Sequence, residues 1–231
     1  MKFALPVLLG SVIGLSTFPA LADEADSSPV SFNVGLTSDY SYRGLTQTNK
    51  KAALQGGVDY SSPNGFSLGA WGSQITWLKD GGSSATMEYD VYGSYASKVG
   101  SFDYSVGFIQ YFYPNDTNAV KADTTEWFVS GTFNDITVKY SSSLTNLFGV
   151  ANSKNSTYLE ASFDIDAGSG VTVTPHVGRQ SIANNTGDYT DFAVTVSKEI
   201  TPSVSVSGGV VGTDLAGSKK PRFILSVSYG F

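Results

Sequence analysis

The sequence predicts an all-β fold: a transmembrane up-and-down antiparallel β-barrel of twelve strands, with short periplasmic turns and longer extracellular loops. Three observations lead to this prediction. Apolar residues recur at every second position in twelve segments, short turns alternate with longer polar loops, and acidic residues avoid the apolar face. Alternation of this kind is typical of strands with one apolar face. A membrane barrel built from such strands has no long apolar run.

The composition excludes several classes of protein. Charged residues make up 15% of the 231-residue chain, against about 25% in ordinary soluble domains. The formal net charge of −6 argues against nucleic acid as a partner. Because the chain contains no cysteine, disulfides, cysteine-ligated zinc and thiol nucleophiles are excluded.

The N-terminus has the pattern of a secretory signal peptide. Lys2 supplies a positive charge, an apolar stretch runs from Phe3 to Phe18, and a small-x-small sequence ends at Ala22. A retained membrane anchor is the alternative, but the apolar stretch is short for one. We therefore expect a cleaved signal peptide, a short periplasmic segment and an outer-membrane barrel, at residues 1–22, 23–31 and 32–231.

The strands follow one another from Phe32 onwards. In the first expected strand, Phe32, Val34, Leu36, Tyr40 and Tyr42 alternate with polar residues or glycine. Eleven further segments repeat this pattern, and in chain order they are Gly56–Tyr60, Phe66–Ala70, Met87–Tyr95, Phe102–Phe112, Trp127–Gly131, Ile136–Tyr140, Leu159–Ile165, Val171–Val177, Phe192–Val196, Val204–Val210 and Phe223–Phe231.

The connections alternate in length. Five tight turns are rich in residues that tolerate turn dihedrals, at 61–65, 97–101, 134–135, 166–170 and 199–203. Six longer polar loops fall between them, at 44–51, 78–85, 114–123, 144–156, 183–189 and 213–221. This is the arrangement of a twelve-stranded barrel in which both termini of the chain lie on the short-turn side.

Two strands depart from the pattern. Pro175 removes a backbone donor from the ninth strand, so we expect a bulge or a water there. The alternation of the third strand changes after Gly72, because Ile75 and Trp77 fall with the polar set. This change predicts a bulge or an extension beyond the bilayer.

Aromatic residues gather toward the ends of the strands, as expected for two interfacial girdles. The long-loop girdle would hold Tyr40, Tyr42, Tyr89, Phe112 and Trp127, and the short-turn girdle Tyr60, Phe66, Phe102, Phe133 and Phe231. The last strand carries apolar residues at every second position up to a terminal aromatic, the pattern that the outer-membrane barrel assembly machinery recognises. This expected assembly signal consists of Phe223, Leu225, Val227, Tyr229 and Phe231.

Three stretches carry a family resemblance: LTSDYSYRGLTQT from Leu36, ALQGGVDYSSPNGFSLGAWGSQI from Ala53 and EYDVYGSY from Glu88. Together with the last strand they resemble the TorF-type outer-membrane porin family of proteobacteria. The resemblance covers most of the chain after the signal peptide and implies an outer-membrane β-barrel of poorly defined substrate. It assigns no chemistry to individual residues.

The inward face is acidic, which predicts a porin for passive, weakly cation-preferring diffusion of small hydrophilic solutes. It holds nine acids against three bases, namely Asp39, Asp59, Glu88, Asp90, Asp103, Glu126, Glu160, Asp164 and Asp191 against Arg43, Lys139 and Arg222. Twelve strands make a narrow barrel that an inward-folded loop would easily obstruct. We expect the pore to be lined by Asp39, Arg43, Gln55, Asp59, Trp71, Glu88, Asp90, Glu126, Lys139, Glu160, Asp164, His176 and Asp191.

Two interior features allow two interpretations each. Arg43 facing Glu88 and Asp90 would create a transverse field across a constriction, or else belong to a buried ion-pair network that rigidifies the barrel. Trp71 and Phe128 would plug the pore or offer a stacking surface for a sugar or nucleoside. For the whole protein, the alternative to a porin is a non-conducting structural or ligand-binding barrel.

An enzyme is the remaining alternative, in the form of a lipid hydrolase. His176 is the single histidine, and position 178 is glycine, so the His-x-Ser pairing of barrel lipases is missing. No HExxH, GxSxG, P-loop or GxGxxG context occurs. We therefore expect no catalytic residues, metal or cofactor. The expected partners are outer-membrane lipid and lipopolysaccharide, the barrel assembly machinery and small solutes.

Overall fold

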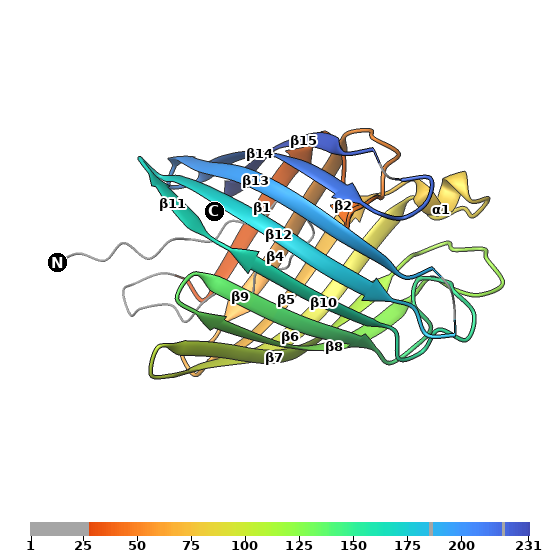
Figure 1. Ribbon diagram of the computed structural model, residues 1–231, viewed down its shortest axis with the longest axis horizontal. Helices are drawn as coiled ribbons and strands as arrows, with labels where there is room; N and C mark the ends of the chain where they lie inside the picture. Colours follow the sequence, from red (N-terminus) through yellow and green to blue (C-terminus); the bar gives the residue numbers. More distant parts are fainter. Residues whose placement is uncertain (1–27, 185–186, 219) are drawn as a thin grey trace.

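The computed structural model describes residues 28–184, 187–218 and 220–231, and it shows a closed antiparallel barrel (Figure 1). The predicted signal peptide lies outside the described residues, as does most of the predicted segment 23–31. Twelve positions in the wall are occupied by β1 (Val30–Thr37), β4 (Ala53–Ser61), β5 (Phe66–Gln74), β6 (Met87–Val99), β7 (Phe102–Phe112), β8 (Thr124–Phe133), β9 (Ile136–Ser143), β10 (Thr157–Phe163) continued by β11 (Ile165–Gly168), β12 (Val171–Ser181), β13 (Tyr189–Thr201), β14 (Val204–Thr213) and β15 (Arg222–Gly230).

Each wall strand pairs with its neighbours in the chain, and the ends of the series meet. β1 pairs with β15 on one side and with β4 on the other, while β10 pairs with both β9 and β12. All of these pairs are antiparallel. The ring therefore has no free edge, and the prediction of a twelve-stranded up-and-down barrel is confirmed.

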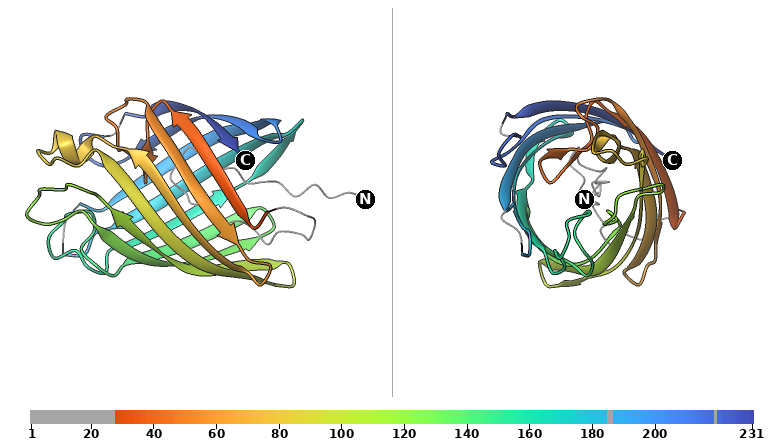
Figure 2. Two further views of the ribbon diagram at one scale, coloured as in Figure 1. Left: turned by 180° about the vertical axis from the view of Figure 1, so that it is seen from behind. Right: turned by 90° about the vertical axis from the view of Figure 1, so that its right-hand side faces the viewer.

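The connections divide the barrel into two ends. Five connections of two to four residues lie at the short-turn end, at 62–65, 100–101, 134–135, 169–170 and 202–203. The longer connections lie at the opposite, long-loop end (Figures 1 and 2). They contain the short helix α1 (Trp77–Asp80) and a small hairpin formed by β2 (Ser41–Tyr42) and β3 (Leu45–Thr46). No helix within the described residues is long and apolar enough to span a membrane.

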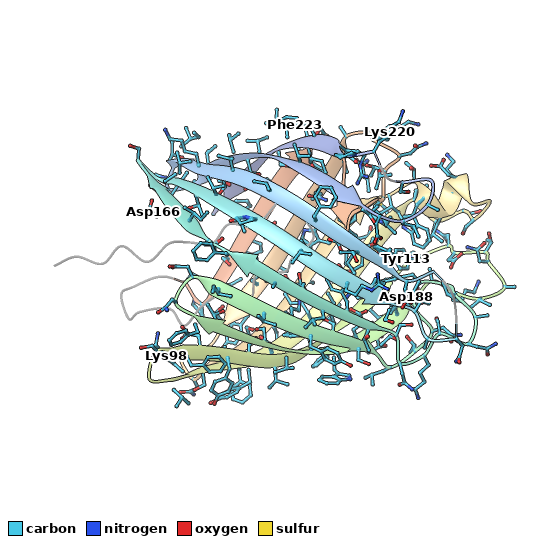
Figure 3. All side chains as sticks on the ribbon, in the orientation of Figure 1. Lys98, Tyr113, Asp166, Asp188, Lys220 and Phe223 are labelled. Carbon is cyan, nitrogen blue, oxygen red and sulfur yellow. The ribbon has the colours of Figure 1, made fainter. Side chains whose placement is uncertain are left out.

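The two faces of the wall differ as the alternation predicts. In β7, Val106 is 48% exposed on the outside, whereas its neighbour Ser105 is 8% exposed on the inside. Large apolar side chains cover the outer face of the other wall strands in the same way, and Phe223 projects outward from β15 in Figure 3. An apolar belt over a wall whose backbone groups are paired within the sheet is what a hydrocarbon environment requires.

The first strand is shorter than predicted. β1 ends at Thr37, and Ser38 makes the last hydrogen bonds to β15. The N–H of Ser38 donates to the carbonyl of Leu225, and the Oγ of Ser38 accepts the N–H of Leu225. The chain then turns into the barrel. The prediction that Tyr40 and Tyr42 belong to an outer aromatic girdle is therefore wrong: Tyr40 is only 4% exposed and packs in the interior with Tyr42.

Neither Gly72 nor Pro175 lies at a β-bulge, which is one of the two forms expected at each position. β5 pairs regularly through Gln74, and Ile75 keeps the inward side of Ser73. It is apolar because it packs in the buried cluster inside the barrel. Pro175 pairs with Val194 in an unshifted register. The neighbouring strand is interrupted instead at Asp164, between β10 and β11, across from the proline that has no N–H to donate.

The outer belt yields a stability prediction. Val106→Arg should lower the free energy of unfolding by about 2–4 kcal/mol, because an arginine on the lipid face near mid-strand meets hydrocarbon. Val106→Leu is the matched control and should leave stability nearly unchanged. Reversible denaturant unfolding in lipid vesicles measures both. An unchanged stability of the arginine variant would contradict a lipid-facing position.

Candidate functional site

The interior at the short-turn end is lined by hydroxyl groups. Serines on neighbouring strands bond to one another across the wall, as in Ser67–Ser94 at 2.7 Å and Ser105–Ser130 at 2.8 Å between Oγ atoms. The pair Thr132–Thr137 repeats this contact at 2.9 Å. These side chains are small and uncharged.

The interior at the long-loop end is filled by the connection between β1 and β4. Residues 39–48, here called the first-loop hairpin, fold inside the ring and include β2 and β3, paired through Ser41 and Thr46. The end-on view of Figure 2 shows this orange segment within the circle of strands. Its tight turn uses Arg43 and Gly44, with φ of 46° and 78°. A loop of the chain itself therefore lies within the barrel at this end.

Arg43 fixes the hairpin to the far wall. Its two terminal nitrogens donate to both carboxylate oxygens of Glu126 on β8, at 3.0 and 2.6 Å, and one of them also donates to Oε1 of Gln180 on β12 at 2.8 Å. The guanidinium lies 4.3 Å from the ring centroid of Tyr158. The ion pair is almost fully buried, with side chains 7% and 2% exposed. A bidentate, ring-stacked arrangement is specific to arginine.

A second set of contacts ties the hairpin to the last strands. Arg222 on β15 donates from Nε to Oδ2 of Asp39 at 2.9 Å and from Nη2 to the carbonyl of Gly44 at 3.1 Å. Asp39 also accepts the hydroxyls of Thr46 and Thr48. Gly44 packs so closely on β13 that an added Cβ would lie 2.5 Å from Cβ of Asp191. Only glycine combines this approach with a positive φ.

Tyrosines connect the hairpin to the wall on the opposite side. The hydroxyl of Tyr40 donates to Oε1 of Glu88 on β6 at 2.6 Å, and the hydroxyls of Tyr42 and Tyr111 lie 2.8 Å apart. Phe148, from the connection after β9, packs edge-on against both Tyr42 and Tyr111. The hairpin therefore contacts the wall around most of its circumference.

The remaining predicted pore residues have identifiable partners on the inner wall. Asp59 accepts the hydroxyl of Tyr92 at 2.6 Å, Asp164 accepts that of Thr174 at 2.5 Å, and Gln55 donates to Ser73 at 3.2 Å. Lys139 lies 3.9 Å from Glu160. The Nε2 atom of His176 lies 3.1 Å from Asp191, which also accepts the hydroxyl of Tyr158 at 2.9 Å. These contacts lie on the inner wall and join strands that are adjacent or one strand apart.

One predicted juxtaposition is wrong. Arg43 was expected to face Glu88 and Asp90, but it pairs with Glu126, because the hairpin turns away from β6 after Tyr40. The arrangement around Arg43 is that of the buried ion-pair network. Among the two candidate stacking residues, Phe128 is buried in the wall beneath Lys139, and Trp71 packs edge-on against Tyr40.

Sequence reasoning missed several residues of this interior. Tyr158 and Gln180 fall on the inward parity of their strands, so their position could have been inferred, although their partners could not. Tyr40 and Tyr42 carried a misleading signal, because their alternation continues that of β1. Asp103, counted among the interior acids, lies at the short-turn rim and pairs with exposed Lys98, which Figure 3 places at that end.

A carboxylate also organises the loops at the long-loop rim. Asp116 accepts the N–H groups of Asn118 and Ala122 at 3.0 and 2.9 Å and the hydroxyl of Ser83 at 2.8 Å. Burial acts to raise the pKa of Asp116, but these hydrogen bonds outweigh it and hold the pKa below its usual value. Asp116 thus joins the connection after β5 to the connection after β7. The described residues contain no group of three or more acids or histidines placed to hold a metal ion.

A closed ring with an apolar outer face and most of its strand acids on the inner face defines a transmembrane β-barrel, and the architecture is that of outer-membrane porins. The chain belongs to the Gcw_chp family, described as bacterial protein of unknown function, whose model matches residues 22–224. This match does not test the resemblance to TorF-type porins, which stays a prediction.

Solved structures share the fold at low sequence identity. The KdgM porin has a TM-score of 0.57 and 13% identity, covering 87% of this chain and 98% of its own. The NanC porin has a TM-score of 0.55 at the same identity and the same coverage. KdgM is also solved in complex with disordered oligogalacturonate. At this identity the likeness shows the fold alone. A comparison with curated proteins finds no match.

The Arg43 ion pair yields the second prediction. Arg43→Ser should lower the free energy of unfolding by about 3–5 kcal/mol, because it leaves the buried carboxylate of Glu126 without its cation. Lys98→Ser is the control, since its pair with Asp103 is half-exposed and contributes about 0–1 kcal/mol. Denaturant unfolding of both refolded variants measures the difference. Equal stabilities would show that the Arg43 contact does not hold the hairpin.

Proposed function

We propose that the protein is an outer-membrane channel for passive diffusion of small hydrophilic solutes, with a weak preference for cations and a constriction formed by the first-loop hairpin. The closed barrel with an apolar outer face is the observation that carries the proposal, and the acids on the inward positions of its strands support the preference for cations. A wall with an apolar outside and a polar inside fits a water-filled passage through lipid. Outer-membrane lipid and lipopolysaccharide would surround it, after export and insertion by the barrel assembly machinery.

The charge of the interior supports a preference for cations. The bases Arg43, Lys139 and Arg222 each lie against one acid, namely Glu126, Glu160 and Asp39. Five interior acids remain without a lysine or arginine ion pair among the described residues: Asp59, Glu88, Asp90, Asp164 and Asp191. Their field would lower the energy of a cation in the passage and raise that of an anion.

This charge also argues against a simple transfer of substrate from the porins of similar fold. Oligogalacturonate, which accompanies KdgM in one structure, is a polyanion. An interior with five acids that lack a lysine or arginine partner would repel such a solute. We therefore propose neutral and cationic small molecules as the solutes of this chain.

A specific observation favours a second candidate, a non-conducting barrel. The hairpin spans the long-loop end and is anchored by Arg43, Tyr40 and Asp39 to β8, β6 and β15. If these anchors hold permanently, the interior is accessible only from the short-turn end, and the barrel has a structural or ligand-binding role. The two candidates differ in whether the hairpin leaves a continuous aqueous path.

Conductance separates them. Refolded protein in a planar bilayer should give discrete, small conductance steps, with a reversal potential in a KCl gradient that indicates cation preference. The double variant Tyr40→Phe with Arg43→Ser removes two anchors and should increase the step size, whereas Lys98→Ser should not. Closed bilayers at all protein amounts for the wild type and the double variant would contradict the channel and favour the second candidate.

A further inference from the structure

Two interior acids differ from the rest in their surroundings. Glu88 and Asp90 on β6 are 2% and 5% exposed, and within the described part of the chain neither forms an ion pair. The interior bases all lie against acids on other elements. Because β6 is extended, residues two apart point to the same face, so both carboxylates face the interior side by side. This wall therefore carries two buried carboxylates without a basic side chain to balance them.

The hydrogen bonding of this pair is incomplete. Glu88 accepts the hydroxyl of Tyr40 at 2.6 Å and also interacts with the hydroxyl of Tyr113, which Figure 3 places toward the long-loop end. In contrast, Oδ1 of Asp90 is buried and has no hydrogen-bond donor among the described residues. A buried carboxylate oxygen without a donor is unfavourable. What the site lacks is a group with N–H donors and positive charge.

Aromatic rings flank Asp90 on both sides. Trp71 on β5 and Tyr111 on β7 are its cross-strand partners, so all three side chains lie on the inner face. Directly opposed side chains have Cβ atoms about 5 Å apart. Tyr40 closes the site from the hairpin side and packs edge-on against Trp71, with ring centroids 5.4 Å apart. Indole and phenol faces attract cations, most strongly where water is excluded.

From this arrangement we infer that Glu88 and Asp90, between the rings of Trp71 and Tyr111, bind a protonated amine. An ammonium group supplies three donors and the missing charge, whereas the described residues provide too few carboxylates and histidines for a metal ion. Trp71 is half-buried and pairs with Gly57 on β4. Asp59 lies two residues further along β4, toward the short-turn end. The inference deepens the proposed function by naming a class of cation, but binding does not require conduction.

Calorimetry on the refolded protein in detergent micelles tests the site, with n-butylammonium chloride as the probe and n-butanol as its neutral counterpart. The wild type should bind butylammonium saturably and butanol not at all. Asp90→Asn removes the charge and should weaken binding about tenfold or more, in line with hydrogen bonds to charged groups. The matched control is Asp103→Asn, the same change at the exposed rim, which should bind like the wild type.

Each outcome decides the inference. No saturable heat with the wild type, equal binding of butanol, or unchanged affinity in Asp90→Asn would overturn it. If Asp90→Asn does not refold, Trp71→Leu decides instead: it should weaken binding about fivefold, and unchanged affinity would overturn the site. A barrel that binds butylammonium but does not conduct supports the site and contradicts the channel. A barrel that conducts without binding does the reverse.

Discussion

Backbone hydrogen bonding in hydrocarbon is the constraint on which the rest of this molecule depends. A strand in lipid has no water to satisfy its N–H and C=O groups, so the sheet must close, and here the β10–β12 and β1–β15 pairs complete the ring. The one residue that cannot donate inside the β12 ladder, Pro175, lies where the adjoining strand is interrupted at Asp164. The ring tolerates this gap because the register on either side is unchanged.

Closure also determines where charge can go. Because the middle of the outer face contacts lipid, the ionisable side chains of the strands lie on the inside or near the strand ends, and on the inside the bases are fewer than the acids. The first-loop hairpin brings one of the missing cations, Arg43, to Glu126 across the barrel. Tyrosine hydroxyls donate hydrogen bonds to acids that have no lysine or arginine partner, as Tyr92 does to Asp59 and Tyr158 to Asp191. The long-loop end is thus a packed polar core, while the short-turn end is lined by hydroxyls.

Much of the wall could be predicted from the sequence, because a two-residue period has only one physical interpretation over many segments. The interior could not be predicted to the same depth. Alternation at Tyr40 and Tyr42 is the same whether the chain continues as a strand or turns inward, and only the ladder ending at Ser38 distinguishes these. The partner of Arg43 depends on where each strand lies around the circumference. Sequence parity places the side chains of Glu126 and Gln180 on the inner face, but it does not say which residue lies across the barrel from them.

The first-loop hairpin has a consequence for the order of assembly. It lies between the first two strands of the wall, yet its anchors are 83, 137 and 183 residues away along the chain, at Glu126, Gln180 and Arg222. Contacts between residues so distant in sequence form late, because closing the long intervening segment costs conformational entropy. An incomplete barrel therefore lacks the contacts with Gln180 and Arg222, and complete docking of the hairpin coincides with the pairing of the last strand to the first.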